Sequence, residues 1–134
     1  MDTKIRVLVA DDMLTMRKIV SKTLKELGFT DIIEAVDGAA AWEALSQSQT
    51  PVGLIVSDWN MPRSTGIDFL KRVRSESRFQ HLPFVLVTAE AEKTQIIEAI
   101  NAGASNYVVK PFTSEILREK LTNAFKNQAI KAAS

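Results

Sequence analysis

The chain has 134 residues, which fits a single domain with an ordinary core, and its 46% hydrophobic and 25% charged residues are typical of a globular protein. Lys and Arg number 17 against 16 Asp and Glu, so no bulk charge attracts nucleic acid or an acidic membrane surface. The absence of cysteine excludes disulfides, thiol nucleophiles and zinc–thiolate sites, and the single histidine, His81, excludes a multi-histidine metal site.

Short apolar runs rich in β-branched residues predict strands over residues 5–10, 31–35, 52–57, 83–88 and 106–109. The runs 5–10, 52–57 and 83–88 are almost continuously apolar, which is typical of parallel strands that are buried on both faces. The run 31–35 is more polar, and we expect its strand to lie nearer an edge of the sheet.

Segments with the periodicity of amphipathic helices lie between and after these runs. Gly28 follows the first helix, where a left-handed C-cap is expected, and the fourth helix ends at Gly103. Asp37 and Thr113 are placed to cap the second and fifth helices, and the third begins near residues 64–66. The side chains expected to face inward on the first and fifth helices are Met16, Ile19, Val20, Thr23, Leu24, Leu27, Ile116, Leu117, Leu121 and Phe125. This alternation of strands and helices predicts an α/β sandwich with right-handed crossovers.

Polar residues stand at the carboxyl ends of four predicted strands: Asp11 and Asp12, Asp58, Thr88, and Lys110. Because these ends lie along one edge of a parallel sheet, we expect the side chains to converge. Three carboxylates repel one another unless a cation joins them, and oxygen ligands of this kind favour a hard ion such as Mg²⁺. The lysine and the threonine hydroxyl could then hold phosphate oxygens, while a carboxylate acts as the nucleophile toward phosphorus.

Each of these residues also has an ordinary structural interpretation. The Asp11–Asp12 pair could cap the first helix, Thr88 could be a simple strand-end threonine, and Lys110 could be a solvated lysine. A following proline at position 111 suggests a fixed turn, with a cis peptide bond, that aims the amine inward. The basic residues of the first helix, such as Arg17, are interpreted as solvated surface that could help to dock an acidic partner.

Four segments resemble the receiver domains of two-component response regulators, and the resemblance covers nearly the whole chain. The segments are Val-Ala-Asp11-Asp12, Val-Ser-Asp58-Trp59-Asn60-Met-Pro, Val-Thr88-Ala-Glu90 and Tyr107-Val-Val-Lys110-Pro-Phe. Residues 15–20, 24–29 and 102–107 add a similarity to the stand-alone chemotaxis members of the family. The resemblance implies a flavodoxin-like, three-layer α/β sandwich with a five-stranded parallel sheet in the order 2-1-3-4-5.

The resemblance also implies a role for each matching residue. Asp58 would be the phosphoacceptor, with Thr88 and Lys110 as the switch hydroxyl and the phosphate-binding lysine. The implied ligands of Mg²⁺ or Mn²⁺ are Asp11, Asp12, Asp58 and the backbone carbonyl of Asn60. The implied switch and partner contacts are Tyr107, Trp59, Glu90 and Lys120. Tyr107 would be an aromatic rotamer switch, although a half-buried edge tyrosine is the plainer interpretation.

One departure from the family pattern lies just before Gly66, where Thr65 replaces the usual acidic residue. Thr65 can still cap the following helix, so we expect the chemistry to be intact and partner contacts near this loop to differ. We expect one receiver domain over residues 1–128 and a short tail over 129–134.

The resemblance implies a signalling domain rather than an enzyme, and we expect it to be monomeric and cytoplasmic. Its expected partners are a sensor histidine kinase, a flagellar motor switch protein and a phosphatase, and not nucleic acid. No signal peptide or membrane-spanning run is visible in the sequence.

Three alternatives stay open on the sequence. A haloacid-dehalogenase-type phosphatase also uses acids, a lysine and Mg²⁺, but its nucleophile follows the first strand with a second acid two residues later. Here the candidate follows the third strand, and position 60 is Asn. A flavodoxin-like FMN protein would bind phosphate with a Ser/Thr-rich loop after the first strand, where this chain has two aspartates. A receiver in a non-motility phosphorelay would have the same site.

Overall fold

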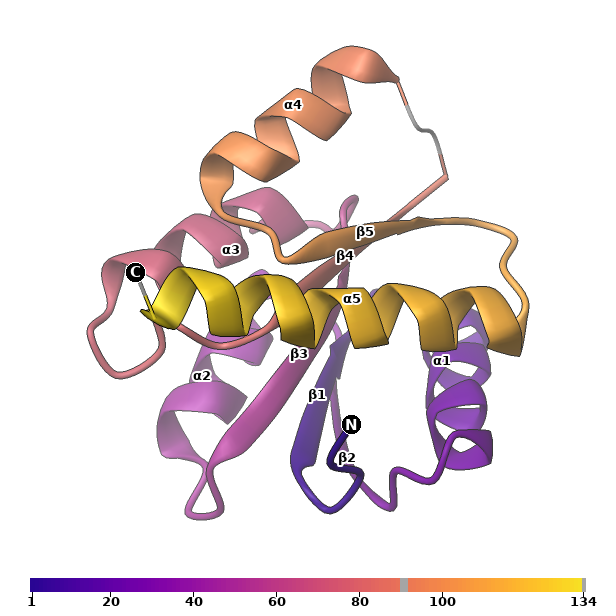
Figure 1. The fold of residues 1–134 in the computed structure, drawn as a ribbon. Helices are drawn as coiled ribbons and strands as arrows, with labels where there is room; N and C mark the ends of the chain where they lie inside the picture. The colour runs from indigo at the N-terminus through magenta and orange to yellow at the C-terminus, as the bar shows by residue number, and fades with distance from the viewer. Residues whose placement is uncertain (90–91, 134) are drawn as a thin grey trace.

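The computed structural model describes residues 1–89 and 92–133 of the chain. Within these residues five strands alternate with five helices (Figure 1). They are β1 (Arg6–Ala10), α1 (Leu14–Glu26), β2 (Asp31–Ala35), α2 (Gly38–Gln47), β3 (Val52–Asp58), α3 (Gly66–Ser75), β4 (Phe84–Thr88), α4 (Lys93–Ala102), β5 (Asn106–Val109) and α5 (Ser114–Ala133). The bounds of every strand agree with the predicted range to within one residue.

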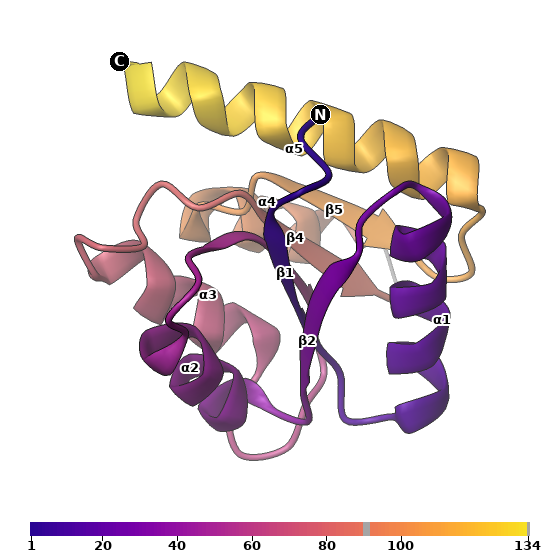
Figure 2. The same ribbon diagram turned by 90° about the horizontal axis from the view of Figure 1, so that it is seen from below.

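The strands form one parallel sheet in the order β2-β1-β3-β4-β5, which confirms the predicted topology. The polar strand β2 lies at an edge, as its composition indicated. Seen from below, α2 and α3 lie on one side of the sheet and α1 on the other (Figure 2). The order reverses between β1 and β3, and the carboxyl ends of the central strands therefore flank the point where open α/β sheets bind ligands.

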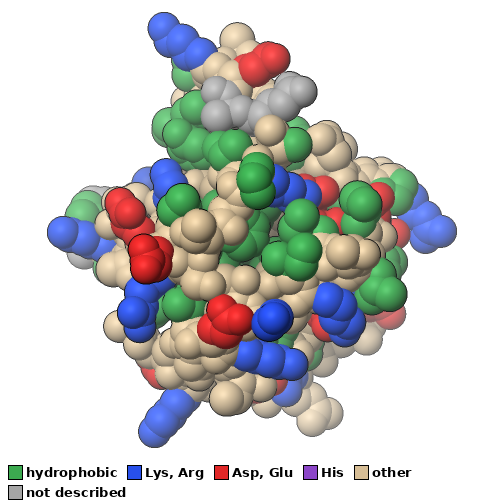
Figure 3. Space-filling view, turned by 90° about the vertical axis from the view of Figure 1, so that its right-hand side faces the viewer, with side chains coloured by type: hydrophobic (Ala, Val, Ile, Leu, Met, Phe, Trp, Pro, Cys, Tyr) green, Lys and Arg blue, Asp and Glu red, His purple; other side chains and the backbone are tan. Residues whose placement is uncertain are grey.

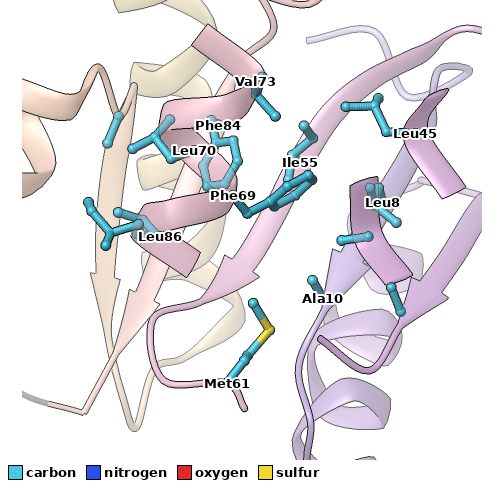
Figure 4. Packing of buried hydrophobic residues seen from close by; sticks show 14 of the residues in the cluster. Leu8, Ala10, Leu45, Ile55, Met61, Phe69, Leu70, Val73, Phe84 and Leu86 are labelled. Atoms are coloured by element: carbon cyan, nitrogen blue, oxygen red, sulfur yellow. The ribbon is translucent and has the colours of Figure 1, made fainter. Parts of the chain in front are cut away.

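Two hydrophobic cores fill the spaces on either side of the sheet. Successive strand side chains point to opposite faces, so Leu8 joins one core while its neighbours Val7 and Val9 join the other. The first core also contains Phe69 of α3 and Phe84 of β4, whose ring centroids are 5.5 Å apart (Figure 4). The second core is closed by α1 and α5. This arrangement makes the molecule a three-layer sandwich.

Asp37 and Thr113 cap α2 and α5, as predicted. The carboxylate of Asp37 accepts an N–H bond of 2.7 Å from the first turn of α2, and the hydroxyl of Thr113 accepts one of 3.1 Å from the first turn of α5. Thr65 forms a capping box with Asp68 at the start of α3, which confirms the prediction that it caps this helix. Gly103 ends α4 with φ 99°, a left-handed conformation that glycine adopts without a side-chain clash.

Two residues predicted to face inward are exposed instead. Ile19 of α1 is 45% exposed and Ile116 of α5 is 43% exposed. Each lies one residue, and therefore about 100° of helix rotation, from the buried residues Val20 and Leu117. Since only a narrow stripe of each helix touches the sheet, these isoleucines fall outside it. Hydrophobic and charged side chains are interspersed on the face shown in Figure 3, and neither sign of charge dominates it.

The C-terminal segment continues as helix. Residue 128, where we expected the domain to end, lies inside α5, which runs on to Ala133. The side chain of Gln128 is buried, and its oxygen accepts a hydrogen bond of 2.9 Å from the hydroxyl of Ser105. None of the helices in the described residues combines the length and the apolar character needed to cross a bilayer.

Candidate functional site

Three carboxylates meet at the carboxyl edge of the sheet. Asp11 and Asp12 follow β1, and Asp58 ends the neighbouring strand β3. One oxygen from each lies within 4.8 Å of the others. Asp11 and Asp58 are buried, whereas Asp12 is exposed. The structure therefore brings together the acids whose convergence we predicted from their positions at strand ends.

Lys110 reaches the same cluster from the end of β5. Its Nζ lies 2.9 Å from Oδ1 of Asp58 and 3.6 Å from Oδ2 of Asp11. The lysine side chain is only 17% exposed, so it is not the solvated surface residue that the plainer interpretation required. The bond between Lys110 and Pro111 is cis, as predicted.

Burial raises the pKa of both buried acids above the ordinary value. For Asp58 the hydrogen bond from Lys110 acts against this rise, while the negative charges of Asp11 and Asp12 add to it. For Asp11 the N–H of Met13 and the charge of Lys110 act against desolvation without cancelling it. One lysine thus leaves the three carboxylates with excess negative charge, a condition that a bound divalent cation would relieve.

The donor set fits a hard cation such as Mg²⁺ or Mn²⁺, because carboxylate and carbonyl oxygens are the ligands these ions take. A hollow of about 360 Å³ opens beside the acids, lined by Asp12, Asn60, Met61, Pro62 and Thr65. Asn60, whose carbonyl was the remaining predicted ligand, therefore lies at the edge of the same hollow as Asp12.

Thr88 and Tyr107 lie on the side of the site nearer α4. Thr88 ends β4 and is buried, and its carbonyl accepts a hydrogen bond of 2.8 Å from the N–H of Lys110. The two side chains line one small cavity together with Trp59, Gln95, Ile96 and Ala99. An inward movement of either side chain would therefore use space that the other one borders.

The remaining predicted switch and partner contacts are Trp59, Lys120 and Glu90. Trp59 follows Asp58 directly and is half-buried. The ammonium nitrogen of Lys120 lies 4.7 Å from the centroid of the Tyr107 ring, a cation–π contact across β5 and α5. Glu90 lies outside the residues that the structure describes.

The backbone around Asp58 is packed tightly. The N–H of Gly66 donates a hydrogen bond of 2.9 Å to the carbonyl of Trp59. A Cβ at position 66 would lie 2.1 Å from the carbonyl oxygen of Asp58, which excludes any larger residue without a shift of the loop. The start of α3 therefore supports the backbone that carries Asp58.

Neither aspartate of the first pair caps α1, so that interpretation is wrong. Met13 occupies the N-cap position without a side-chain cap, and Oδ1 of Asp11 accepts the N–H of Met13 at 2.9 Å. Two residues that sequence reasoning missed hold this loop. Arg17 donates to the backbone carbonyl of Asp11 at 2.9 Å, and Glu34 on β2 accepts from Arg17 at 3.1 Å. The sequence offered only a weak signal for this ion pair, namely a basic residue on the first helix and an acidic residue on an edge strand.

The family model described as response regulator receiver domain matches residues 7–122. The chain belongs to this family. The receiver is 48% identical over 121 residues to the chemotaxis protein CheY of Pseudomonas aeruginosa, a match that covers 90% of this chain and 96% of that protein. It is 46% identical over 116 residues to the chemotaxis protein CheY1 of Helicobacter pylori, covering 87% of this chain and 93% of the relative.

Solved structures have the same fold. The chemotaxis protein CheY4 of Vibrio cholerae superposes on the receiver with a TM-score of 0.82 at 33% sequence identity, covering 90% of this chain and 98% of that one. Family membership accounts for the position of the acids at the ends of β1 and β3, which the two rival fold families did not explain.

Proposed function

We propose that this receiver is a chemotaxis response regulator that accepts a phosphoryl group on Asp58 from a sensor histidine kinase. The observation that carries the proposal is the 2.9 Å contact between Lys110 and Asp58 beside two further carboxylates. Support for the chemotaxis assignment comes from relatives named chemotaxis proteins over nearly their whole length. We place its action in the cytoplasm, as a monomer.

The carboxylates of Asp11, Asp12 and Asp58, with the backbone carbonyl of Asn60, would hold Mg²⁺ or Mn²⁺. The ion would supply positive charge to the oxygens of the transferring phosphoryl group. Because the cluster carries three carboxylates and one lysine, it needs such compensation before a second anion can approach.

In the transfer, a carboxylate oxygen of Asp58 attacks phosphorus in line with the leaving group. The new bond joins this oxygen to phosphorus, and the phosphorus–nitrogen bond to the donor histidine breaks, with its electron pair returning to the imidazole. Lys110 stabilises the charge on the phosphoryl oxygens, and the hydroxyl of Thr88 donates a hydrogen bond to one of them. The product is an aspartyl phosphate, so the domain itself is consumed as an acceptor and is no ordinary turnover enzyme.

The signal would leave through the surface formed by α4, β5 and α5. Movement of Thr88 toward the phosphoryl group would free space that Tyr107 can fill, since both residues border one cavity. The fourth helix is loosely held, because Ala99 is its one fully buried residue among those described, while Ile97 and Ile100 are 47% and 58% exposed. A local change of charge would then bias a two-state surface and its affinity for a flagellar motor switch protein. A phosphatase would reset it.

Stoichiometric labelling tests the proposal. The protein is mixed with MgCl₂ and a small phosphodonor, and the added phosphate is located by mass spectrometry of peptides. We expect one base-labile phosphate on Asp58, absent in Asp58→Asn and absent without Mg²⁺. Phosphate on a serine or threonine would overturn the site, and steady hydrolysis of phosphomonoesters would favour the phosphatase instead.

Partner binding tests the second half of the proposal. The phosphorylated protein is titrated with a purified flagellar motor switch protein, and Asp58→Asn serves as the control. We expect phosphorylation to tighten binding by at least about tenfold, the range of ordinary allosteric coupling. Equal binding by the two forms would refute the motor output and leave the phosphoacceptor chemistry standing.

A further inference from the structure

Arg17 joins the loop that carries the acid cluster to the edge strand of the sheet. Its Nη1 donates a hydrogen bond of 2.9 Å to the backbone carbonyl of Asp11, and its Nε donates one of 3.1 Å to Oε1 of Glu34. The Arg17 side chain is 13% exposed and that of Glu34 is 26% exposed, so the bond to the Asp11 carbonyl is partly buried whereas the bond to Glu34 lies at the surface. A rigid guanidinium fork that uses two of its donors in this way fixes the distance between its two partners.

The carbonyl of Asp11 and the N–H of Asp12 belong to the same peptide unit, which is planar. A hydrogen bond to that carbonyl therefore sets the orientation of the plane from which Asp12 begins. The N–H of Asp11 is fixed separately, by a bond of 3.0 Å to the carbonyl of Ala35, and its side chain accepts from Met13 at 2.9 Å. Asp11 thus has two anchors that do not involve Arg17, while the exposed Asp12 depends on the peptide that Arg17 holds.

Glu34 holds Arg17 in turn. Burial alone would raise the pKa of the Glu34 carboxyl, but the hydrogen bonds from Lys18 and Arg17 more than offset this and lower it. The carboxylate is therefore ionised at neutral pH. Lys18 donates to the second oxygen at 2.9 Å, yet it is 64% exposed and has no bond to the acid loop among the described contacts.

We propose that Arg17, held by Glu34, is a positioning residue that orients the Asp11–Asp12 peptide and so presents Asp12 to a divalent cation. The inference rests on the proposed function, in that it takes the acid cluster as the metal site. Residues of α1 and β2 thereby contribute to the metal site, although neither Arg17 nor Glu34 belongs to the polar residues at strand ends from which the site was predicted.

Position and charge predict opposite results for the loss of Arg17. A cation near three carboxylates competes with a metal ion, so removing its charge would tighten Mg²⁺ binding if charge alone mattered. Loss of a group that orients a ligand weakens metal affinity instead, by about 10-fold or more in other metal sites. The sign of the change therefore separates the two roles.

The experiment measures the dissociation constant for MgCl₂ by isothermal titration calorimetry, with unfolding of the metal-free protein followed in parallel. We expect Arg17→Ala to bind Mg²⁺ about 10-fold more weakly than the wild-type protein. The matched control is Lys18→Ala, which removes the same charge from the same carboxylate without touching the acid loop, and it should bind within about twofold of the wild type. An affinity of Arg17→Ala within threefold of the wild type, or a tighter one, would overturn the inference.

A second pair of variants decides the matter if Arg17→Ala does not fold. Glu34→Ala and Glu34→Gln lose the same charge, but only the glutamine keeps an acceptor oxygen for Arg17. We expect the alanine variant to bind Mg²⁺ at least threefold more weakly than the glutamine variant, and equal affinities would contradict the proposal. No Mg²⁺ binding by the wild-type protein would refute the metal site itself, whereas normal wild-type binding with unaffected variants would refute the role of Arg17 alone.

Discussion

The ammonium group of Lys110 lies 2.9 Å from a carboxylate oxygen of Asp58, although 52 positions separate the two residues in the chain. The contact forms because β5 and β3 end at the same edge of the sheet, with only β4 between them. It places the positive charge of the cluster against the acid that we propose as the nucleophile, where it can act on both the acceptor and the incoming phosphoryl group.

Removal of the amine should slow phosphorylation and uncouple it from output. In Lys110→Ala the pKa of Asp58 loses a lowering influence, and the phosphoryl oxygens lose a donor. We expect the rate of phosphorylation by a small phosphodonor to fall roughly 100-fold, as when other charge-stabilising donors are removed. We also expect that phosphorylated Lys110→Ala does not bind its partner more tightly than the unphosphorylated form. Rates come from mass spectrometry. Lys126→Ala, an exposed lysine on α5, should behave as the wild type. Normal partner binding by phosphorylated Lys110→Ala would deny the amine a signalling role.

Replacement of Asp58 should stabilise the metal-free protein in a pH-dependent way. The pKa of Asp58 is raised in the folded state, so the folded protein binds more protons than the unfolded one between the ordinary value of 3.8 and the raised value. The charged carboxylate therefore destabilises the fold above the raised pKa, and this effect disappears as the pH falls toward 3.8. We expect Asp58→Asn to unfold at higher urea concentration than the wild type at pH 7, with a difference that shrinks at pH 4. A difference independent of pH would count against the explanation.

Metal binding should be visible through Trp59. This residue adjoins Asp58 and is half-buried, so its emission should change when Mg²⁺ is added and return when a chelator removes the ion. The chain has one other tryptophan, Trp42, which packs edge-on against Phe79 with ring centroids 5.7 Å apart. Trp59→Phe should therefore retain fluorescence without the Mg²⁺ response. If the fluorescence of Trp59→Phe still changed with Mg²⁺, the change would come from Trp42 and would not report on the acid cluster.

A half-buried arginine, Arg74, should account for a large share of stability at the opposite end of the sheet. Arg74 donates to the carbonyls of Gly103 at 2.9 Å and Leu82 at 2.6 Å, and to the side-chain oxygens of Ser105 and Gln128. Burial lowers its pKa to about 10. We expect Arg74→Met to lose about 2–4 kcal/mol of unfolding free energy, because it leaves buried acceptors without donors.

Urea denaturation measures this loss, and Arg78→Met is its control. Arg78 is 57% exposed and pairs with Glu76 at 3.3 Å, so its loss should cost less than about 1 kcal/mol. Equal losses in the two variants would show that the network around Arg74 adds nothing beyond an ordinary surface ion pair.

Local chemistry in the sequence was enough to predict the strands, the α/β class and the convergence of the acids. Strand ranges followed from β-branched runs, and the caps Asp37 and Thr113 followed from residues that satisfy the first turn of a helix. The convergence of Asp11, Asp58 and Lys110 followed from a general property of parallel sheets, whose carboxyl ends share one edge. These features depend on neighbours in the chain or on the fold class alone.

Only the tertiary structure decided which helix residues are buried and which partners the long side chains contact. Ile19 and Ile116 have the hydrophobicity of core residues, yet each lies one residue outside the stripe of its helix that packs on the sheet and is exposed. Arg17 looked like solvated surface, but the pairing of β2 with β1 brings Glu34 close to the Asp11 carbonyl, and Arg17 bonds to both. A long flexible side chain has many partners within its radius, and the sequence does not specify which of them the packed fold will place there.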